Sequence, residues 1–235
     1  MTTRSRFAAG VLTFFDRTTR ETVLPVSPVF FEDDFLGPAL NTTKWTALDT
    51  GAATEAVVAD LANGAVGLAL DATNEVQLAG ISWNDQRTLA LNQGLILEAR
   101  FRLSVLPSAA SVIAVLGLQG DHNAAVDTVA ESIWFRADGN GQITVESDDT
   151  SHETSKVATG VTVTTADWVI GKIDCTDIAD VKFFINGNRV AEGTTFNMSQ
   201  VAGLALQPVA RVSKSAATSV GTMQVDYIRA WMNRA

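Results

Sequence analysis

The residues of this chain best suited to acid–base chemistry are its carboxylates. Two pairs of adjacent aspartates stand out, Asp33-Asp34 and Asp148-Asp149. A pair of carboxylates can act on one substrate atom only when both side chains lie on the same face of the chain. Neighbouring residues on an extended chain point to opposite faces. Neither pair is therefore expected to form a catalytic site by itself.

Other reactive residue types are few. The two histidines, His122 and His152, lie in polar segments, and no serine occupies a G-x-S-x-G motif. No clustered Cys and His spacing suggests zinc, and no glycine-rich loop precedes a helix to hold phosphate. The one cysteine, Cys175, excludes an intramolecular disulfide and is expected to be a buried thiol. The sequence thus predicts a protein without catalytic residues, bound metal or cofactor.

Calcium is the one metal for which the loops offer ligands. Two loops carry side-chain oxygens, which calcium prefers. Turn formation explains the same residue types better, because Asp and Asn side chains bond to the backbone of turns. We therefore assign no metal site and keep calcium as the alternative for Asp121, Asn123 and Asp127, or for Asp138 and Asn140.

Tryptophans are the candidates for contact with a sugar, because an indole ring can stack on a pyranose face. The chain has five, and a core position is equally natural for most of them. We predict Trp83 and Trp134 as the glycan-stacking residues if a glycan is bound.

These side chains must be carried by β-strands, because short segments rich in Val, Ile, Leu, Phe and Thr alternate with turn residues, and helical periodicity is hard to find. In residues 95–103 the apolar side chains share one face, while Glu98, Arg100 and Arg102 share the other. Strands are predicted within residues 11–16, 55–61, 65–71, 75–83, 95–104, 111–119, 132–138, 142–147, 167–175, 181–187, 189–194, 204–213 and 223–232.

Two turns fix the pairing of neighbouring strands. Asn186-Gly187 suits a two-residue type I′ turn, whose central residues both need positive φ, and the run from Asp138 to Gly141 is read in the same way. About a dozen strands with short loops and no helical crossovers predict an all-β fold. We expect a two-sheet antiparallel jelly-roll sandwich, with a closed barrel as the alternative.

The composition limits the possible partners. A chain of 235 residues with 46% hydrophobic and 18% charged residues can bury a sizeable core. Its net charge of -9 argues against nucleic acid and anionic membranes as ligands. No apolar run approaches the roughly 18 residues of a membrane span, and the N-terminus is a poor signal peptide. We expect a protein that stays in the cytoplasm where it is made.

Residues 1–28 differ from the rest of the chain. They carry four arginines and two acids, a charge of +2, which leaves 13 - 24 = -11 for residues 29–235. Two apolar strips flank a polar turn, and two prolines then keep the chain extended. We predict an N-terminal arm or hairpin over residues 1–28 and one sandwich domain over residues 29–235. The arm is expected to bind a partner through Phe7, Val11, Leu12, Phe14, Phe15, Arg17 and Arg20.

The two ends of the sandwich domain resemble a known superfamily. Asp34-Phe35, Gly37, Leu40 and Trp45 are similar to the opening D-F-x-G-x-x-L-x-x-x-x-W of laminarinase-like glycoside hydrolases and related concanavalin A-like sandwiches. Residues 225–231 resemble their closing strand. Trp168 and the segment 181–187, with its F-x-x-N-G hairpin, are similar to laminin-G-like members. The resemblance covers about residues 30–232 and rests mostly on structural positions.

The same resemblance implies that the catalytic acids are missing. Retaining hydrolases need a nucleophile and a general acid about 5 to 5.5 Å apart, which the family supplies as E-x-D-x-x-E. The matching strand here begins at Glu131, with Ile133 and Arg136 where the second and third acids belong. A rearranged hydrolase would need Glu98, Glu131 or Glu146 to meet a carboxylate across strands.

Three functions follow from these observations. We favour a non-enzymatic structural virion protein, most simply a phage capsid decoration or cement protein. Its arm would bind identical copies and a major capsid protein or another virion protein, and it would be found in the virion after assembly in the host cytoplasm. The first alternative is a carbohydrate-binding module or lectin of the same fold. The second is a divergent glycoside hydrolase.

Overall fold

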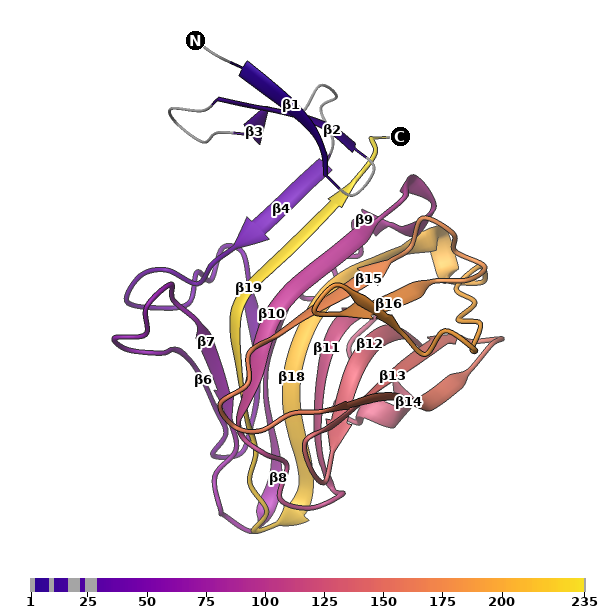
Figure 1. Cartoon of the computed structure of the whole chain (residues 1–235). Coiled ribbons are helices and arrows are strands. Elements are labelled where there is room, and N and C mark those ends of the chain that lie inside the picture. Colours follow the sequence, from indigo (N-terminus) through magenta and orange to yellow (C-terminus); the bar gives the residue numbers. More distant parts are fainter. Residues whose placement is uncertain (1–2, 9–10, 17–21, 24–28, 235) are drawn as a thin grey trace.

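The computed structural model describes residues 3–8, 11–16, 22–23 and 29–234. From residue 29 onward it consists of two eight-stranded antiparallel sheets, packed face to face (Figure 1). The predicted all-β, two-sheet antiparallel jelly-roll sandwich is confirmed.

The first sheet, here called the β10 sheet, contains the strand that closes the chain. Its central strands are β10 (Ile96–Val105) and β19 (Thr222–Met232), and β4 (Val29–Asp33) pairs with the C-terminal part of β19. The full order is β17 (Asn188–Val190), β16 (Lys182–Ile185), β15 (Val169–Asp174), β10, β19, β7 (Val66–Ala69) and β6 (Thr54–Val57).

The second sheet, here called the β12 sheet, carries the strand that resembles the catalytic strand of the hydrolases. A short strand, β9 (Leu89–Ala90), pairs with its strand β18. The full order is β14 (Thr154–Thr162), β13 (Gln142–Asp149), β12 (Glu131–Asp138), β11 (Val112–Gln119), β18 (Ala205–Ala217), β8 (Glu75–Ser82) and β5 (Thr46–Thr50).

Helical structure in the described ranges is limited to three short 3-10 turns, η1 (Leu91–Gln93), η2 (Val126–Thr128) and η3 (Ala202–Leu204). Within this part of the chain, no helix has the length and apolar character needed to cross a membrane.

The N-terminal residues form a small sheet of their own. Strands β1 (Thr3–Ala8), β2 (Val11–Asp16) and β3 (Thr22–Val23) pair with one another in the order β1-β2-β3. Figure 1 shows this sheet beyond the end of the sandwich where β4 begins and β19 ends. The register sets Phe7 opposite Leu12 and Phe14 opposite Val23. Opposed residues share a face of a sheet, so these four positions share one face.

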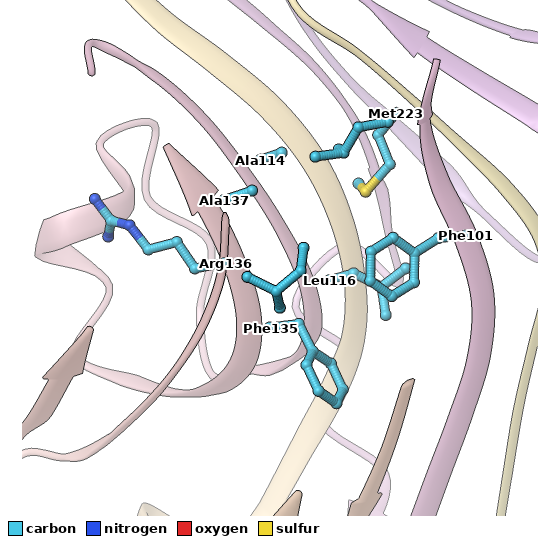
Figure 2. Close-up of a pocket in the computed structure, with 9 residues that line it drawn as sticks. Phe101, Ala114, Leu116, Phe135, Arg136, Ala137 and Met223 are labelled. Atoms are coloured by element: carbon cyan, nitrogen blue, oxygen red, sulfur yellow. The ribbon is translucent and has the colours of Figure 1, made fainter. Parts of the chain in front are cut away.

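The core lies between the two large sheets. On β10, Leu97, Phe101 and Leu103 are buried, whereas Arg100 and Arg102 lie on the outer face, which confirms the predicted alternation. A cavity of about 10 Å³ remains inside the core, lined by residues that include Phe101, Leu116, Phe135 and Met223 (Figure 2). A space of this size holds at most a single water, so this cavity does not hold a larger ligand.

The opening acidic stretch has a structural role. Asp33 Oδ2 accepts a hydrogen bond from Trp45 Nε1 at 2.8 Å, and Asp33 Oδ1 accepts one from the Phe35 backbone at 3.0 Å. Trp45 is 1% exposed and packs against the rings of Phe31 and Phe35. The carboxylate of Asp33 therefore anchors the start of the sandwich to its core.

The two predicted hairpins are present, with different turns. Asn186 and Gly187 both have positive φ, 50° and 81°, and connect β16 to β17 as a two-residue turn. The β12–β13 connection has three residues between its strands, and only Gly139 there has positive φ. The sequence patterns did not predict β4, β5, β9 or β14.

Candidate functional site

The candidate site lies on the outer face of the β12 sheet. Along β12, Ile133 and Phe135 point into the core, whereas Trp134 and Arg136 point outward. Figure 2 shows Arg136 directed away from Leu116, Phe135 and Met223. The resemblance places the second and third acids of a hydrolase at positions 133 and 136. Ile133 lies in the core, and Arg136 points outward.

The outward side chains form a buried polar network. Trp134 Nε1 donates a hydrogen bond to Glu146 Oε2 at 2.7 Å, and Arg136 Nη1 lies 3.2 Å from Glu146 Oε1. Arg136 also forms ion pairs with Asp127 and Asp138. Burial by itself would lower the pKa of Arg136, but the three carboxylates outweigh it and raise the pKa. Both carboxylate oxygens of Glu146 therefore have a partner, one in Trp134 and the other in Arg136.

A loop covers this network. The β11–β12 loop, residues 120–130, buries Val126 and Val129 against Val115, Val209 and Trp134. Trp134 is consequently 2% exposed. This part of the outer face of the β12 sheet is therefore closed by the chain itself.

A second buried arginine lies under the same loop. Arg211, on β18, is fully buried, and its Nη1 donates to the carbonyl of Asn123 and lies 3.4 Å from His122 Nδ1. Burial lowers the pKa of Arg211 to about 10, partly opposed by the charge of Asp127. It also lowers the pKa of His122, with the charge of Arg211 adding to the effect.

The three glutamates considered for a rearranged hydrolase each pair with a cation, although Glu131 also lies directly opposite a carboxylate, Asp149, in the β12–β13 register. Glu98 lies on the outer face of the β10 sheet, where it accepts hydrogen bonds from Tyr227 Oη at 2.8 Å and from Arg229 at 2.5 Å. Glu131 lies on the face of β12 opposite to Glu146, and it contacts Arg87 Nη2 at 2.5 Å. Each is held by its own cation.

The adjacent aspartates also point apart, as expected. Asp149 is fully buried and accepts hydrogen bonds from the backbone of His152 and Gln200. Asp148 lies on the outer face, two residues from Glu146 along β13. Burial raises the pKa of Asp148, and the charge of Glu153 adds to the effect. The sequence pattern did not indicate that Asp148 and Glu146 share this face of β13.

The two tryptophans predicted to stack on a glycan are both packed inside the protein. Trp83 is half-buried, with its ring 4.8 Å from that of Phe31 and 6.4 Å from that of Trp45. Trp134 lies under the β11–β12 loop and can meet a ligand only when the loop moves. Their stacking role stays a prediction.

The residues predicted for partner binding fall on the N-terminal sheet. Phe7 belongs to β1 and Val11, Leu12, Phe14 and Phe15 belong to β2. Arg17 and Arg20 lie outside the described residues.

The oxygen ligands considered for calcium have other partners. Asp127 and Asp138 pair with Arg136, while Asn123 and Asn140 accept hydrogen bonds from backbone N–H groups two residues further on. Among the residues that the structure describes, no group of three or more His, Cys, Asp or Glu side chains is arranged so that it could hold a metal ion.

Several solved structures with this architecture are glucanases or glucanase-like proteins. A family 16 glucanase of Bacteroides ovatus that acts on mixed-linkage glucan is 12% identical, covering 84% of this chain and 98% of its own, with a TM-score of 0.61. A β-1,3-glucanase from Mycobacterium marinum is 17% identical, covering 86% and 97%, with a TM-score of 0.59. A pseudo β-1,3-glucanase of Mycobacterium tuberculosis is 16% identical, covering 87% and 98%, with a TM-score of 0.57.

The comparisons define the fold. The chain has the concanavalin A-like jelly-roll fold of laminarinase-like glucanases. No protein-family model matches the sequence, and no curated protein matches it. At these identities the shared architecture says nothing about catalytic activity.

Proposed function

We propose that this protein is a non-catalytic structural component of a larger assembly, attached through residues 1–28 as a capsid decoration protein is attached to a phage virion. The observation that carries the proposal is the closed outer face of the β12 sheet. Its outward positions on β12 hold Trp134 and Arg136, and Glu146 is bound to both. While the β11–β12 loop covers this face, the face cannot serve as the attachment surface, and we place attachment on residues 1–28 instead.

The N-terminal sheet supplies a surface for attachment. One of its faces carries Phe7, Leu12, Phe14 and Val23. Its third strand has only two residues, so the sheet is close to a two-stranded hairpin, which is marginally stable without further packing. Full burial of four such side chains against a partner would contribute on the order of 6 to 12 kcal/mol. That is enough to hold a subunit in place.

The adjoining end of the sandwich extends this apolar surface. Phe30, on β4, is 53% exposed and pairs with Trp231 on the outer face of the β10 sheet. Trp231 is in turn paired with Ile96. The three residues form a row on one side of the sheet near the start of β4, in which Phe30 and Trp231 are accessible and Ile96 is buried. A partner that binds the N-terminal sheet has a second apolar contact within reach.

Deletion of residues 1–28 tests the attachment. The full chain should show a native mass above that of one subunit by light scattering, and it should sediment with virions of a phage that encodes it. The shortened chain should be folded, monomeric and unable to sediment with the particles. Equal assembly by the shortened chain would contradict the proposal.

A matched pair of substitutions separates the two faces of the N-terminal sheet. Phe14→Ser alters the face shared with Phe7, whereas Phe15→Ser alters the opposite face. We expect Phe14→Ser to weaken assembly more than Phe15→Ser. The reverse order would place the contact on the other face.

An enzymatic role is tested with laminarin and xylan. We expect no release of reducing sugar from either substrate. Release that disappears in both Glu146→Gln and Asp148→Asn would identify the outer face of the β12 sheet as a working active site and overturn the proposal.

A further inference from the structure

The outer face of the β12 sheet buries polar atoms that have no partner. In the described part of the chain, eleven buried side-chain nitrogen and oxygen atoms lack a hydrogen bond. Five of them lie on this face, and they belong to Gln119, Arg136 and Arg211. Buried polar groups without partners are rare in folded proteins. Their concentration on one face indicates that something else binds there.

Arg211 is the least compensated of these residues. Its Nε and Nη2 have no hydrogen-bond partner, and no carboxylate among the described residues lies within 4.0 Å of its guanidinium. Arg136, by contrast, pairs with three carboxylates. A buried cation without a counterion is strongly unfavourable. An anionic group from a ligand is the natural complement.

The two arginines are placed to hold one ligand. Arg211, Val115 and Arg136 lie side by side on three adjacent strands, so the two arginine Cα atoms are about 10 Å apart. Trp134 lies two residues from Arg136 on the same face. The face therefore offers two guanidinium groups beside one indole ring, with the amide of Gln119 further along.

Two oxygen-bearing groups of the β11–β12 loop bind the two arginines on this face. Asp127 places its carboxylate on Arg136, and the carbonyl oxygen of Asn123 accepts from Arg211. The side chain of Asp127 is 65% exposed, and an ion pair with so exposed a partner contributes little to stability. A ligand with a stronger anionic group can therefore compete with the loop for both arginines.

We propose that the outer face of the β12 sheet binds an anionic saccharide, and that the β11–β12 loop lifts to admit it. Carboxylate or sulfate groups of the saccharide bind Arg211 and Arg136 and replace Asp127. A sugar ring packs on Trp134, and hydroxyl groups bind Gln119 and Glu146. The saccharide class follows from the indole ring and amide beside the arginines, the combination that contacts the apolar faces and hydroxyls of sugars. This site is independent of the attachment through residues 1–28.

Calorimetry with the full chain tests the ligand class. The probes are a heparin hexasaccharide, a hyaluronan hexasaccharide, neutral laminarihexaose, sodium sulfate and an oligoglutamate peptide. We expect the two anionic saccharides to bind and laminarihexaose not to bind. Hydrogen exchange of residues 120–130 should become faster in the complex, because the loop leaves the face.

Three variants locate the site. Asp127→Asn removes the competing carboxylate and should tighten binding roughly threefold. Arg211→Met should weaken binding about tenfold or more, because it removes charged hydrogen bonds. Arg102→Met is the matched control, since Arg102 lies on the outer face of the other sheet, and it should bind as the full chain does.

Several results would overturn this inference. Failure of both anionic saccharides to bind the full chain and Asp127→Asn would exclude the site. So would equal affinity of Arg211→Met, or loop exchange that ligand leaves unchanged. Binding of sulfate or oligoglutamate without binding of the saccharides would show that the ligand is not a sugar.

Discussion

Removal of the Arg136 guanidinium is the most direct test of the network under the β11–β12 loop. Arg136 is 2% exposed and pairs with Asp127, Asp138 and Glu146. In Arg136→Met, Asp127 can return to water, because its side chain is already 65% exposed. Glu146, with a side-chain exposure of 11%, keeps only its bond from Trp134. Breaking a buried pair in this way costs about 3 to 5 kcal/mol, and we expect a value near the lower limit.

The loss can be measured by urea unfolding, followed by far-ultraviolet circular dichroism. In a chain of this size each kcal/mol shifts the melting temperature by about 2 to 4 °C, so about 3 kcal/mol corresponds to roughly 6 to 12 °C. Lys156→Met is the matched control. Lys156 also contacts Asp138, at 2.8 Å, but its side chain is 50% exposed, and its loss should cost less than about 1 kcal/mol.

The stability of Arg136→Met can also be compared with that of the full chain at acid pH. The hydrogen bond from Arg136 holds the pKa of Asp127 below its usual range. A carboxyl whose folded pKa is lowered stabilises the protein above its unfolded pKa of about 3.9 and loses this contribution as the pH falls. The difference in the free energy of unfolding between the full chain and Arg136→Met should therefore become smaller at acid pH. A cost below about 1 kcal/mol at pH 7, equal to that of Lys156→Met, would refute the reasoning.

Three further predictions test the packing and the buried groups. A Cβ at Gly117 would lie 2.3 Å from the carbonyl oxygen of Ile133, so Gly117→Ala should cost about 1 to 3 kcal/mol in urea unfolding, whereas Gly193→Ala, in open space, should be nearly neutral. Cys175 is fully buried, which raises its pKa, so it should react with a thiol reagent at pH 8 only after unfolding. Burial would raise the pKa of Asp149, but hydrogen bonds from three backbone N–H groups outweigh it and lower the pKa. Stability should therefore fall as the pH drops below about 4, and Asp149→Asn should be less stable at pH 7 but less sensitive to acid.

Strand prediction was most accurate where a strand buries one face. Strand β10 was predicted nearly to the residue, because its apolar residues alternate with Glu98, Arg100 and Arg102. Strand β14 was missed because it lies at the edge of its sheet and alternates only between exposed and half-buried positions. Edge strands bury little, so their composition resembles that of loops.

The candidate site was predicted only in part. The sequence was enough to show Ile133 and Arg136 at the β12 positions where the resemblance places acids, because a strand keeps the spacing of its residues. The covering loop and Arg211 could not be read, because the bond between Arg211 and Asn123 joins residues 88 positions apart. Such contacts depend on how the strands are ordered in the sheet, and no local pattern records that order. Arg211 lies on the outer face of its strand and is buried only because the β11–β12 loop folds over it, which the sequence alone does not indicate.

The pairing of β4 with β19 has a mechanical consequence for a protein held by its N-terminal residues. Tension on residues 1–28, when it acts along β4, is transmitted through five residue pairs to β19. That strand lies in the interior of its sheet and is bonded to β10 along its other edge. The hydrogen bonds between β4 and β19 then share the load in shear, rather than opening one after another. Tension on residues 1–28 is therefore expected to leave β4, the first strand of the sandwich, paired with β19.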